Sequence, residues 1–464
     1  MLIVALCSLL SAAHGAESFA GHTFYFGDIH AHTGISPDGG SLDLDNCLDP
    51  TACGNLADVF ETAVANHLDF VAFTDHSVAD QEQFDDFLAL VIDATTDTFV
   101  TIPAAELQLQ WDSPAGADIG HKNVYVFQDD DAALADLSVS DLAGPSKFFE
   151  ACEDVWTNAA TLSTTFGPTL EFAHHPAAGT VRPTDWSCNS ETYQPVVEVY
   201  SDWGNSLETA PTYDPVDEPV EASTVHEALE TNQLKLGFVG GTDLHDTRPG
   251  NTCVIDTEYT DTKHYGGGLT MVMLDEDAPF VRSAIYGEMV ARRTLATTGP
   301  EMPVLVQWIT SDQRRHEIGE EIRVRDSDST SLSVRVPRAW ERYVTGVEAV
   351  GYDERITLTD TGTGRWGETI ANDTLPGWLY VEVAFDGAAY YGVGVCADGG
   401  DNDDERVWSS PVWFDVTDDL DQDGYAHDVD CNDDAPRIHP DARDKPNNGT
   451  DENCDGADAT RPGG

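Results

Sequence analysis

The stretch YFGDIHAHTGISPDGG, residues 25–40, begins as an apolar strand and ends in a polar segment that contains glycine. His30 and His32 stand two positions apart where the apolar run stops. Side chains at positions i and i+2 of a strand point to the same face of a sheet. Both imidazoles would therefore point into one polar space, and this stretch predicts a site built at the ends of strands.

Similar short apolar runs recur from Thr23 to about Leu274, with helix-like stretches between several of them. One such stretch, NLADVFETAVANHL (55–68), carries apolar residues at helical spacing between the first two runs. Nearly continuous apolar runs are typical of parallel strands that are covered on both faces. The repeated order of strand, helix and strand favours an α/β barrel.

Most of these apolar runs end in, or lie next to, a histidine or a carboxylate. The residues at these points are His30, His32, Asp75, His76, Glu106, His121, His174, His175, Glu198, Asp243 and His245. The C-terminal strand ends of an α/β barrel meet on one face, and imidazole together with carboxylate suits Zn, Mn or Fe. Any one of these motifs would also fit a hydrogen-bonded structural histidine or a helix cap, whereas their joint occurrence predicts a metal centre.

Six of these segments resemble, in order, the motifs of the polymerase-and-histidinol-phosphatase (PHP) superfamily of metal-dependent phosphoesterases. They are GDIHAHTGISPDGG, FTDHS, PAAEL, GHKNVYVF, AHHPA and GGTDLHD. The sequence is also similar to a PHP-like family of secreted or periplasmic proteins known as a domain of unknown function, through VEVYSDWGNSLE, ARRTLATTGPEMPV and VWSSPVWFDV. The resemblance covers about Gly21 to Val416. It implies a distorted seven-stranded PHP barrel of the TIM-like β/α class.

This resemblance also implies two or three metal ions in the barrel, each with its own set of ligands. The first set is His30, His32, Glu106 and Asp243. The second set is Glu106, which would bridge two ions, with His121 and one of the adjacent pair His174 and His175, of which His175 is favoured. The third set is Asp38, which replaces a histidine of other members, with His76 and His245. The neighbouring Asp28 and Asp75 are expected to orient the imidazoles.

The implied reaction is hydrolysis of a phosphate ester by a metal-activated water at a di- or trinuclear site. We assign catalytic roles to Glu106, Asp243 and Arg248. The guanidinium of Arg248 would clamp phosphate oxygens, and a surface salt bridge explains this residue equally well. Weaker candidates for contact with the substrate are Lys122, Arg182 and Glu198, the last of which would otherwise cap a strand.

Two other functions fit the same residues. A metal site of His and Asp in an α/β barrel also serves the hydrolysis of amide and ester bonds, although the sequence has no evident strand with a carboxylated lysine. A non-catalytic surface or binding protein on a degenerate barrel would instead use the C-terminal regions. The complete set of ligands favours the phosphoesterase, and the expected partner is a small-molecule or phosphorylated substrate.

The charge and the N-terminal residues indicate where the protein works. Asp and Glu number 84 against 23 Lys and Arg, which gives a net charge of −61. Such a surface repels nucleic acid and anionic membranes, so neither is an expected partner. Residues 1–15 resemble a secretory signal, because an apolar run from Leu2 to Ala13 leads to the small-residue cleavage motif Ala13-His14-Gly15. We expect no membrane span, and a secreted, periplasmic or cell-surface location.

The cysteines agree with an oxidising compartment. The chain has nine cysteines, and removal of Cys7 with the signal leaves eight. An even number in a secreted protein favours disulfides over metal thiolates. The expected pairs are Cys431 with Cys454 and Cys47 with Cys53, and the sequence does not pair the others.

The region after Pro303 changes in character. Alternating and apolar runs between turns predict an antiparallel β-sandwich over residues 303–416, which would follow the barrel of residues 21–302. An Asp-rich tail then covers residues 417–457.

The tail carries the spacing of a calcium-binding loop. The expected Ca²⁺ ligands are Asp419, Asp421, Asp423 and, at the twelfth position, Asp430. The tail also closely resembles the Asp-rich calcium-binding repeats of secreted bacterial proteins. Because the tail has little apolar content, it would need Ca²⁺ and the Cys431–Cys454 bridge to become ordered, and a disordered acidic tail is the alternative.

Overall fold

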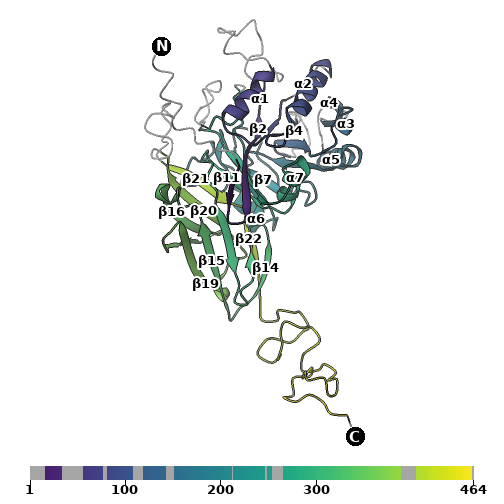
Figure 1. The fold of residues 1–464 in the computed structure, drawn as a ribbon, viewed down its shortest axis with the longest axis vertical. Helices are drawn as coiled ribbons and strands as arrows, with labels where there is room; N and C mark the ends of the chain where they lie inside the picture. Colours follow the sequence, from purple (N-terminus) through teal and green to yellow (C-terminus); the bar gives the residue numbers. More distant parts are fainter. Residues whose placement is uncertain are drawn as a thin grey trace.

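The computed structural model describes residues 16–33, 56–76, 81–107, 119–142, 151–211, 213–245, 248–252, 265–387 and 404–461. Strands outnumber helices in this part of the chain, which runs from β1 to β22 and from α1 to α7 (Figure 1). The strands form a mixed sheet of 14 strands, a five-stranded sheet and a three-stranded sheet. An acidic tail follows the last strand.

The first part of the large sheet has the predicted order of strand, helix and strand. The parallel neighbours are β2 (His22–Ala31), β3 (Phe70–Phe73) and β4 (Val100–Glu106). The connecting helices are α1 (Leu56–Ala65) and α2 (Gln81–Ala94). Val59 of α1 and Leu88 of α2 share an apolar core with Val71 of β3, so both helices cover this part of the sheet.

The later strands do not continue the parallel pattern. The next strands of the large sheet are β5 (Lys122–Val126), β6 (Thr169–Ala173), β10 (Leu269–Asp275) and β11 (Thr294–Thr297). β5 is antiparallel to β4 and β6, and β10 is antiparallel to β2 and β11. The separate three-stranded sheet consists of β7 (Val196–Ser201), β8 (Gly204–Asn205) and β9 (Gly237–Gly240). The helices between these strands are α3 (Asp131–Leu134), α4 (Val139–Leu142), α5 (Cys152–Phe166), the 3-10 turn η2 (Glu221–Ser223), α6 (Val225–Glu230) and α7 (Arg282–Val290).

The expected distorted seven-stranded β/α barrel is therefore wrong. The large sheet has the order β14-β22-β20-β21-β11-β10-β2-β3-β4-β5-β6 and mixes parallel with antiparallel pairs. The expectation failed because a continuous apolar run reports burial on both faces of a strand and does not report its direction. Every residue of β5 and of β6 is buried, although the two strands are antiparallel to each other.

The strands after Pro303 form two facing layers. The five-stranded sheet contains, in sheet order, β13 (Arg315–His316), β12 (Leu305–Ile309), β15 (Ser329–Arg335), β19 (Arg365–Ala371) and β18 (Thr359–Asp360). The strands that belong to the large sheet are β14 (Glu321–Arg325), β16 (Val344–Val350), β17 (Arg355–Thr357), β20 (Trp378–Asp386), β21 (Asp404–Ser409) and β22 (Val412–Thr417). Short 3-10 turns are η3 (Glu341–Tyr343) and η4 (Asn372–Thr374). Trp308 of β12 and Val383 of β20 share one core with Phe24 of β2.

These two layers are joined to the N-terminal part by a continuous sheet. β21 pairs with β11 through Leu295 opposite Ser409 and Thr297 opposite Val407. The sheet therefore crosses the expected boundary between residues 302 and 303. A β-sandwich that is separate from the preceding strands does not describe this arrangement.

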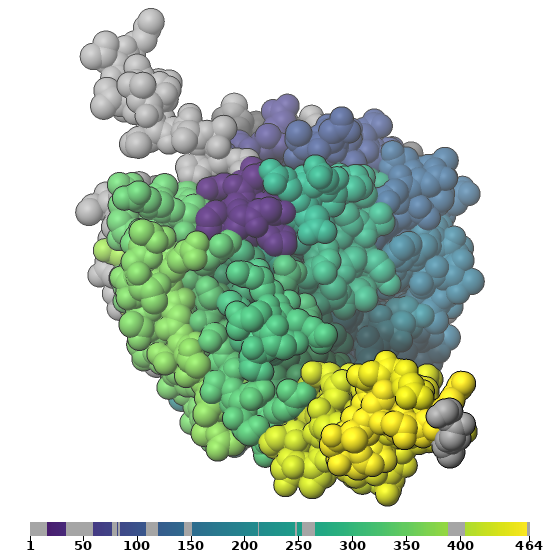
Figure 2. All heavy atoms as spheres, turned by 60° about the horizontal axis from the view of Figure 1, so that its bottom comes forward, coloured from purple at the N-terminus to yellow at the C-terminus, as the bar shows by residue number. Residues whose placement is uncertain are grey.

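The tail, residues 418–461, extends from the end of the large sheet (Figure 1) and occupies one edge of the molecule in Figure 2. It contains turns and bends and neither helices nor strands within the described residues. Arg325 of β14 forms ion pairs with Asp433 at 2.7 Å and with Asp434 at 3.1 Å. These ion pairs attach the start of the tail to the edge of the sheet.

Candidate metal centre

The histidines and carboxylates that the sequence singles out converge at one end of the N-terminal strands. They lie within, or within a few residues of, strands β2, β3, β4, β5, β6, β7 and β9. The side chains of His30, His32 and His174 are fully buried, whereas those of His76 and His121 are 15% and 19% exposed. The site is therefore largely enclosed and opens to solvent beside His76 and His121.

The first expected set of ligands is assembled closely. His30 Nε2 lies 3.1 Å from Asp243 Oδ1 and 3.4 Å from Glu106 Oε2. His32 Nε2 lies 3.2 Å from Asp243 Oδ1 and 3.5 Å from Glu106 Oε2. One ligand atom of each of these four residues lies within 4.8 Å of the others. This spacing is suitable for a single bound cation.

The two oxygens of the Glu106 carboxylate face different groups of histidines. Oε2 faces His30 and His32 and lies 3.5 Å from His76 Nε2. Oε1 lies 2.9 Å from His121 Nδ1 and 3.3 Å from His174 Nε2. Glu106 thus has the position that a carboxylate needs in order to bridge two cations.

The second group contains both members of the adjacent histidine pair. His121, His174 and His175 place ligand atoms within 4.8 Å of one another. His174 contacts Glu106, whereas Nε2 of the favoured His175 lies 3.8 Å from Asp243 Oδ2. The contact with Glu106 therefore favours His174 as the partner of His121, and His175 is the member of the group that faces Asp243.

The third group includes a residue that the sequence did not assign to it. His32, His76 and His245 place ligand atoms within 4.8 Å of one another. The ring of His32 is stacked on that of His245, with centroids 4.0 Å apart, and its centroid lies 4.8 Å from that of His76. Asp38, the remaining expected ligand, lies outside the described residues.

The backbone around the site has an uncommon conformation at two of these residues. His175 has a φ of 31° and Asp243 has a φ of 55°. Residues other than glycine seldom adopt positive φ, and such conformations cluster at functional sites. Gly241, two residues before Asp243, permits a close approach, since an added Cβ there would lie 2.4 Å from the Cβ of His30.

Glu198, and not Asp28, orients His30. Glu198 Oε2 lies 2.8 Å from His30 Nδ1, and Glu198 also accepts a hydrogen bond from the backbone N–H of His175. Asp28 instead accepts hydrogen bonds from Thr242, from Gly250 and from the backbone N–H of His30. The expectation that Asp28 orients an imidazole is therefore wrong, because its oxygens are occupied by backbone and hydroxyl groups. Glu198 was detectable in the sequence as a carboxylate within an apolar run, PVVEVYS.

Asp75 also holds the backbone near the site. It accepts hydrogen bonds from the backbone N–H of Thr33 at 2.7 Å and from the Thr33 hydroxyl at 2.8 Å. Thr33 directly follows His32, so Asp75 fixes the chain at the end of β2.

The electrostatics of the site depend on both burial and neighbouring charge. Burial alone would raise the pKa of Glu106, but the adjacent His76 and His174 lower it well below its usual range. Burial alone would lower the pKa of His30, but Asp243 and Glu198 raise it well above its usual range. Burial lowers the pKa of His174 to about 4, although Glu106 opposes this shift. Burial also lowers the pKa of His32 and of His175 well below the usual range, so these two imidazoles and that of His174 are neutral, which is the form that binds a metal.

Several buried ligand atoms lack a hydrogen-bond partner among the described residues. They include His174 Nε2 and Asp243 Oδ2. Unpaired polar atoms are costly in a protein interior, and a cation would satisfy them. Together with the imidazole and carboxylate donors, these atoms fit Zn, Mn or Fe.

The three candidate substrate-binding cations differ in position. Arg248 is exposed and lies on the segment that follows His245. Lys122 is fully buried, donates a hydrogen bond to Gln194 at 2.7 Å and lies over the Trp156 ring. Lys122 is therefore a core residue and does not serve the substrate, whereas Arg182 is half-buried.

The tail forms the expected loop at its four aspartates. Gly424 N–H donates to Asp419 at 2.9 Å, and Asp423 N–H donates to Asp421 at 3.2 Å. Each of the four expected ligands keeps one buried oxygen without a hydrogen-bond partner among the described residues; these are Asp419 Oδ1, Asp421 Oδ2, Asp423 Oδ2 and Asp430 Oδ2. This arrangement fits Ca²⁺, a hard cation that prefers oxygen ligands.

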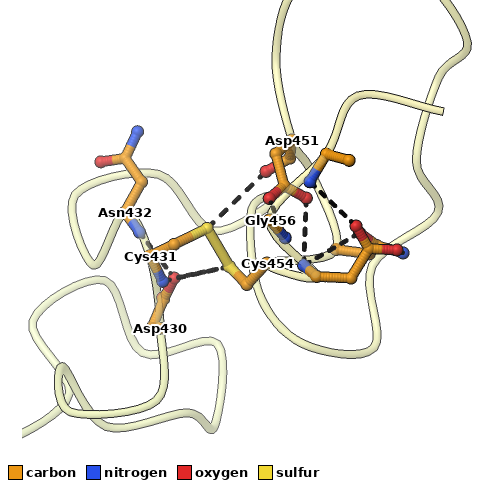
Figure 3. Close-up of a disulfide and its surroundings, with 9 residues drawn as sticks. Asp430, Cys431, Asn432, Asp451, Cys454 and Gly456 are labelled. Atoms are coloured by element: carbon orange, nitrogen blue, oxygen red, sulfur yellow. Dashed lines mark hydrogen bonds between the residues drawn. A yellow bond between two sulfur atoms is a disulfide. The ribbon is translucent and has the colours of Figure 1, made fainter.

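A second loop in the tail repeats the hydrogen bonds of the first. Gly456 N–H donates to Asp451 at 2.7 Å, as Gly424 N–H does to Asp419, and both glycines have positive φ. Figure 3 shows this second loop beside the Cys431–Cys454 disulfide. The tail thus contains two loops that share the same Gly-to-Asp hydrogen bond and are joined by a disulfide.

Two disulfides lie within the described residues. Cys431 and Cys454 are bonded, in agreement with the expected pair. Cys152 and Cys188 are also bonded, and the sequence did not predict this pair. The expected pair Cys47 with Cys53, and also Cys253 and Cys396, lie outside the described residues.

Comparisons with known proteins give little information about this site. No family model matches the chain, and no solved structure matches it. An uncharacterized protein of Chlamydia pneumoniae is 34% identical over 126 residues, which is 26% of this chain and 18% of that protein. The chain thus spans less than a fifth of that relative's length. Among the described residues, no helix is long and apolar enough to span a membrane.

Proposed function

We propose that this chain is a secreted metal-dependent phosphoesterase with a di- or trinuclear site. The position of Glu106 is the observation that carries this proposal. One of its oxygens faces His30 and His32, and the other faces His121 and His174. When bound there, two or more divalent cations would act as Lewis acids and lower the pKa of a water molecule toward neutrality.

The protein's own residues prepare the site for these cations. The Nδ1 atom of His30 faces Glu198, which fixes the tautomer and leaves Nε2 directed at Glu106 and Asp243. The high pKa of His30 places a proton between these groups in the metal-free protein. A cation would replace this proton, so metal binding should release protons to the solvent.

The substrate would reach the site from the side of His76 and His121, the two partly exposed histidines. The net charge of −61 repels an anionic substrate, and bound cations reverse the local field. The guanidinium of Arg248, which is exposed on the segment after His245, would contact the phosphate group. We propose a substrate-binding role for this residue, and a structural calcium-binding role for the four aspartates of the tail.

Two observations support secretion. The described residues contain two disulfides, which persist in oxidising compartments. Residues 1–15 have the composition of a secretory signal.

The test is a metal analysis combined with turnover measurements on the purified protein. We expect at least two transition-metal ions per chain and hydrolysis of a generic phosphomonoester or phosphodiester that is lost on chelation. Arg248→Ala should raise KM and leave the metal content unchanged, and Arg342→Ala, at an exposed position in η3, is the matched control. Fewer than two ions per metal-replete chain would refute the site. Hydrolysis of amides or esters alone would refute the phosphate substrate.

A further inference from the structure

The N-terminal hairpin lies directly after the proposed cleavage site between Gly15 and Ala16. β1 (Glu17–Phe19) forms an antiparallel hairpin with β2, in which Glu17 pairs with Phe24 and Phe19 with His22. Figure 2 shows this N-terminal segment, in purple, at the surface of the molecule beside the green C-terminal strands. The Trp340 indole N–H donates to Glu17 at 3.2 Å, so the hairpin is also attached to the C-terminal part of the chain.

The first described residue, Ala16, contacts a buried carboxylate. The backbone N–H of Ala16 donates to Asp69 Oδ1 at 3.2 Å, and the N–H of Phe26 donates to Asp69 Oδ2 at 2.9 Å. Asp69 is only 6% exposed. No Lys, Arg or His side chain among the described residues forms an ion pair with it. Within the described part of the chain, Asp69 is therefore a buried carboxylate that accepts hydrogen bonds from backbone amides and has no cationic partner.

A second carboxyl, that of the partly buried Glu301, lies close enough to be affected by Asp69. Burial raises the pKa of Glu301 to about 9, and the charge of Asp69 adds to this shift. Burial also raises the pKa of Asp69 to about 7, against the opposing effect of its two amide hydrogen bonds. The phenol of Tyr25 on β2 is also affected by Asp69. A positive charge at this position would stabilise the ionised form of Asp69.

We propose that removal of residues 1–15 creates this positive charge, because the new amino terminus of Ala16 forms an ion pair with Asp69. Water, delivered by a leader-cleaving endopeptidase, adds across the Gly15–Ala16 peptide bond. The bond breaks, Gly15 leaves as a carboxylate, and the Ala16 nitrogen becomes an α-ammonium. This inference rests on the proposed secretion. Cleavage after Gly15 would then add the last contact that holds the N-terminal hairpin in place.

The pH dependence of this ion pair has a defined sign. A free α-amino group has a pKa of about 7.7–8.0, and pairing with Asp69 should raise this pKa in the folded protein. The stability from the pair is therefore lost as the pH rises through the folded-state pKa of the amine, and it is also lost at low pH, where Asp69 becomes protonated. Charged hydrogen bonds exceed neutral ones in strength, so the pair should lower the unfolding equilibrium constant by about tenfold.

The experiment compares two chains that differ only in where they begin. One chain is released by a protease so that it starts at Ala16, and the other so that it starts at His14, which moves the amine by two residues. Urea unfolding at pH 7 should give an unfolding constant about tenfold larger for the chain that starts at His14. In Asp69→Asn the two chains should unfold alike, whereas the exposed control Asp97→Asn should keep the difference.

Several outcomes would overturn the inference. Equal unfolding constants for the two wild-type chains, or an unchanged difference in Asp69→Asn, would refute the ion pair. If Asp69→Asn does not fold, the pKa of the Ala16 amine is measured by the pH dependence of its acylation. A value clearly above 8 supports the pair, and an ordinary value refutes it. Intact mass of the secreted protein locates its amino terminus, and any start other than Ala16 refutes the inference without affecting the metal centre.

Discussion

Replacement of Glu106 by glutamine should remove the charge that the proposed cations share. Glu106 lies 2.9–3.5 Å from imidazole nitrogens of both histidine groups. A bound cation would therefore lie roughly 4 Å or less from the carboxylate. Two unit charges at about 4 Å interact by about 4 kcal/mol at an effective dielectric constant of about 20, and a divalent cation carries twice that charge. The loss of the carboxylate charge should therefore lower the affinity for one divalent cation by at least about a thousandfold.

The assay is metal stoichiometry by mass spectrometry together with turnover on the best phosphate ester substrate. We expect Glu106→Gln to lose at least one ion per chain and to reduce kcat by roughly a thousandfold or more. The matched control is Glu405→Gln. Burial raises the pKa of Glu405 to about 8, so this side chain is mostly neutral at pH 7. Its replacement by glutamine therefore removes far less charge than the same replacement at Glu106.

The result must be separated from a loss of folding. Glu106→Gln should keep its secondary structure, because Glu106 is held by side chains of the site and its backbone remains in β4. A folded Glu106→Gln protein with the full metal content and full activity would refute the bridging role of Glu106. Loss of both metal and activity in Glu405→Gln would show that the assay reports stability and not the site.

Four further predictions follow from other contacts. Glu198→Gln should lower the metal affinity by about 10- to 100-fold in equilibrium dialysis, because Glu198 orients His30, and unchanged affinity would contradict this role. Addition of a calcium chelator should make residues 418–456 sensitive to limited proteolysis while the sheets stay intact, and Asp430→Asn should have the same effect as the chelator. Equal cleavage with and without chelator would argue against calcium. Replacement of Cys152 and Cys188 by alanine should lower the free energy of unfolding by about 4 kcal/mol, since the disulfide closes a loop with a sequence separation of 36. An unchanged midpoint of urea unfolding would exclude this contribution. Glu405 has a raised pKa in the folded protein, so its contribution to stability is fully present below the ordinary glutamate pKa of 4.5 and is lost as the pH rises to about 8; Glu405→Gln should flatten the loss of stability between these two pH values, and parallel curves would contradict this.

The sequence predicted the members of the candidate site better than it predicted the fold. His30 and His32 share a face because they stand two residues apart on a strand, and this relation is local. The direction of the later strands is not local. The apolar runs of β5 and β6 predict buried strands whether the strands are parallel or antiparallel. Only the pairing of β5 with β6 shows that they are antiparallel. The α/β barrel was therefore a wrong inference from a correct reading of burial.

What the sequence by itself determined was the chemistry available to this protein: histidines and carboxylates at strand ends, an aspartate loop of calcium-binding spacing, and the Cys431–Cys454 pair within that short tail. The tertiary structure alone decided which distant groups meet. His30 and Glu198 are 168 positions apart, and Ala16 and Asp69 are 53 positions apart. Local spacing fixes where a side chain points along its own element. The partner of a buried charge is chosen by how the elements pack, and no short-range pattern in the sequence encodes that packing.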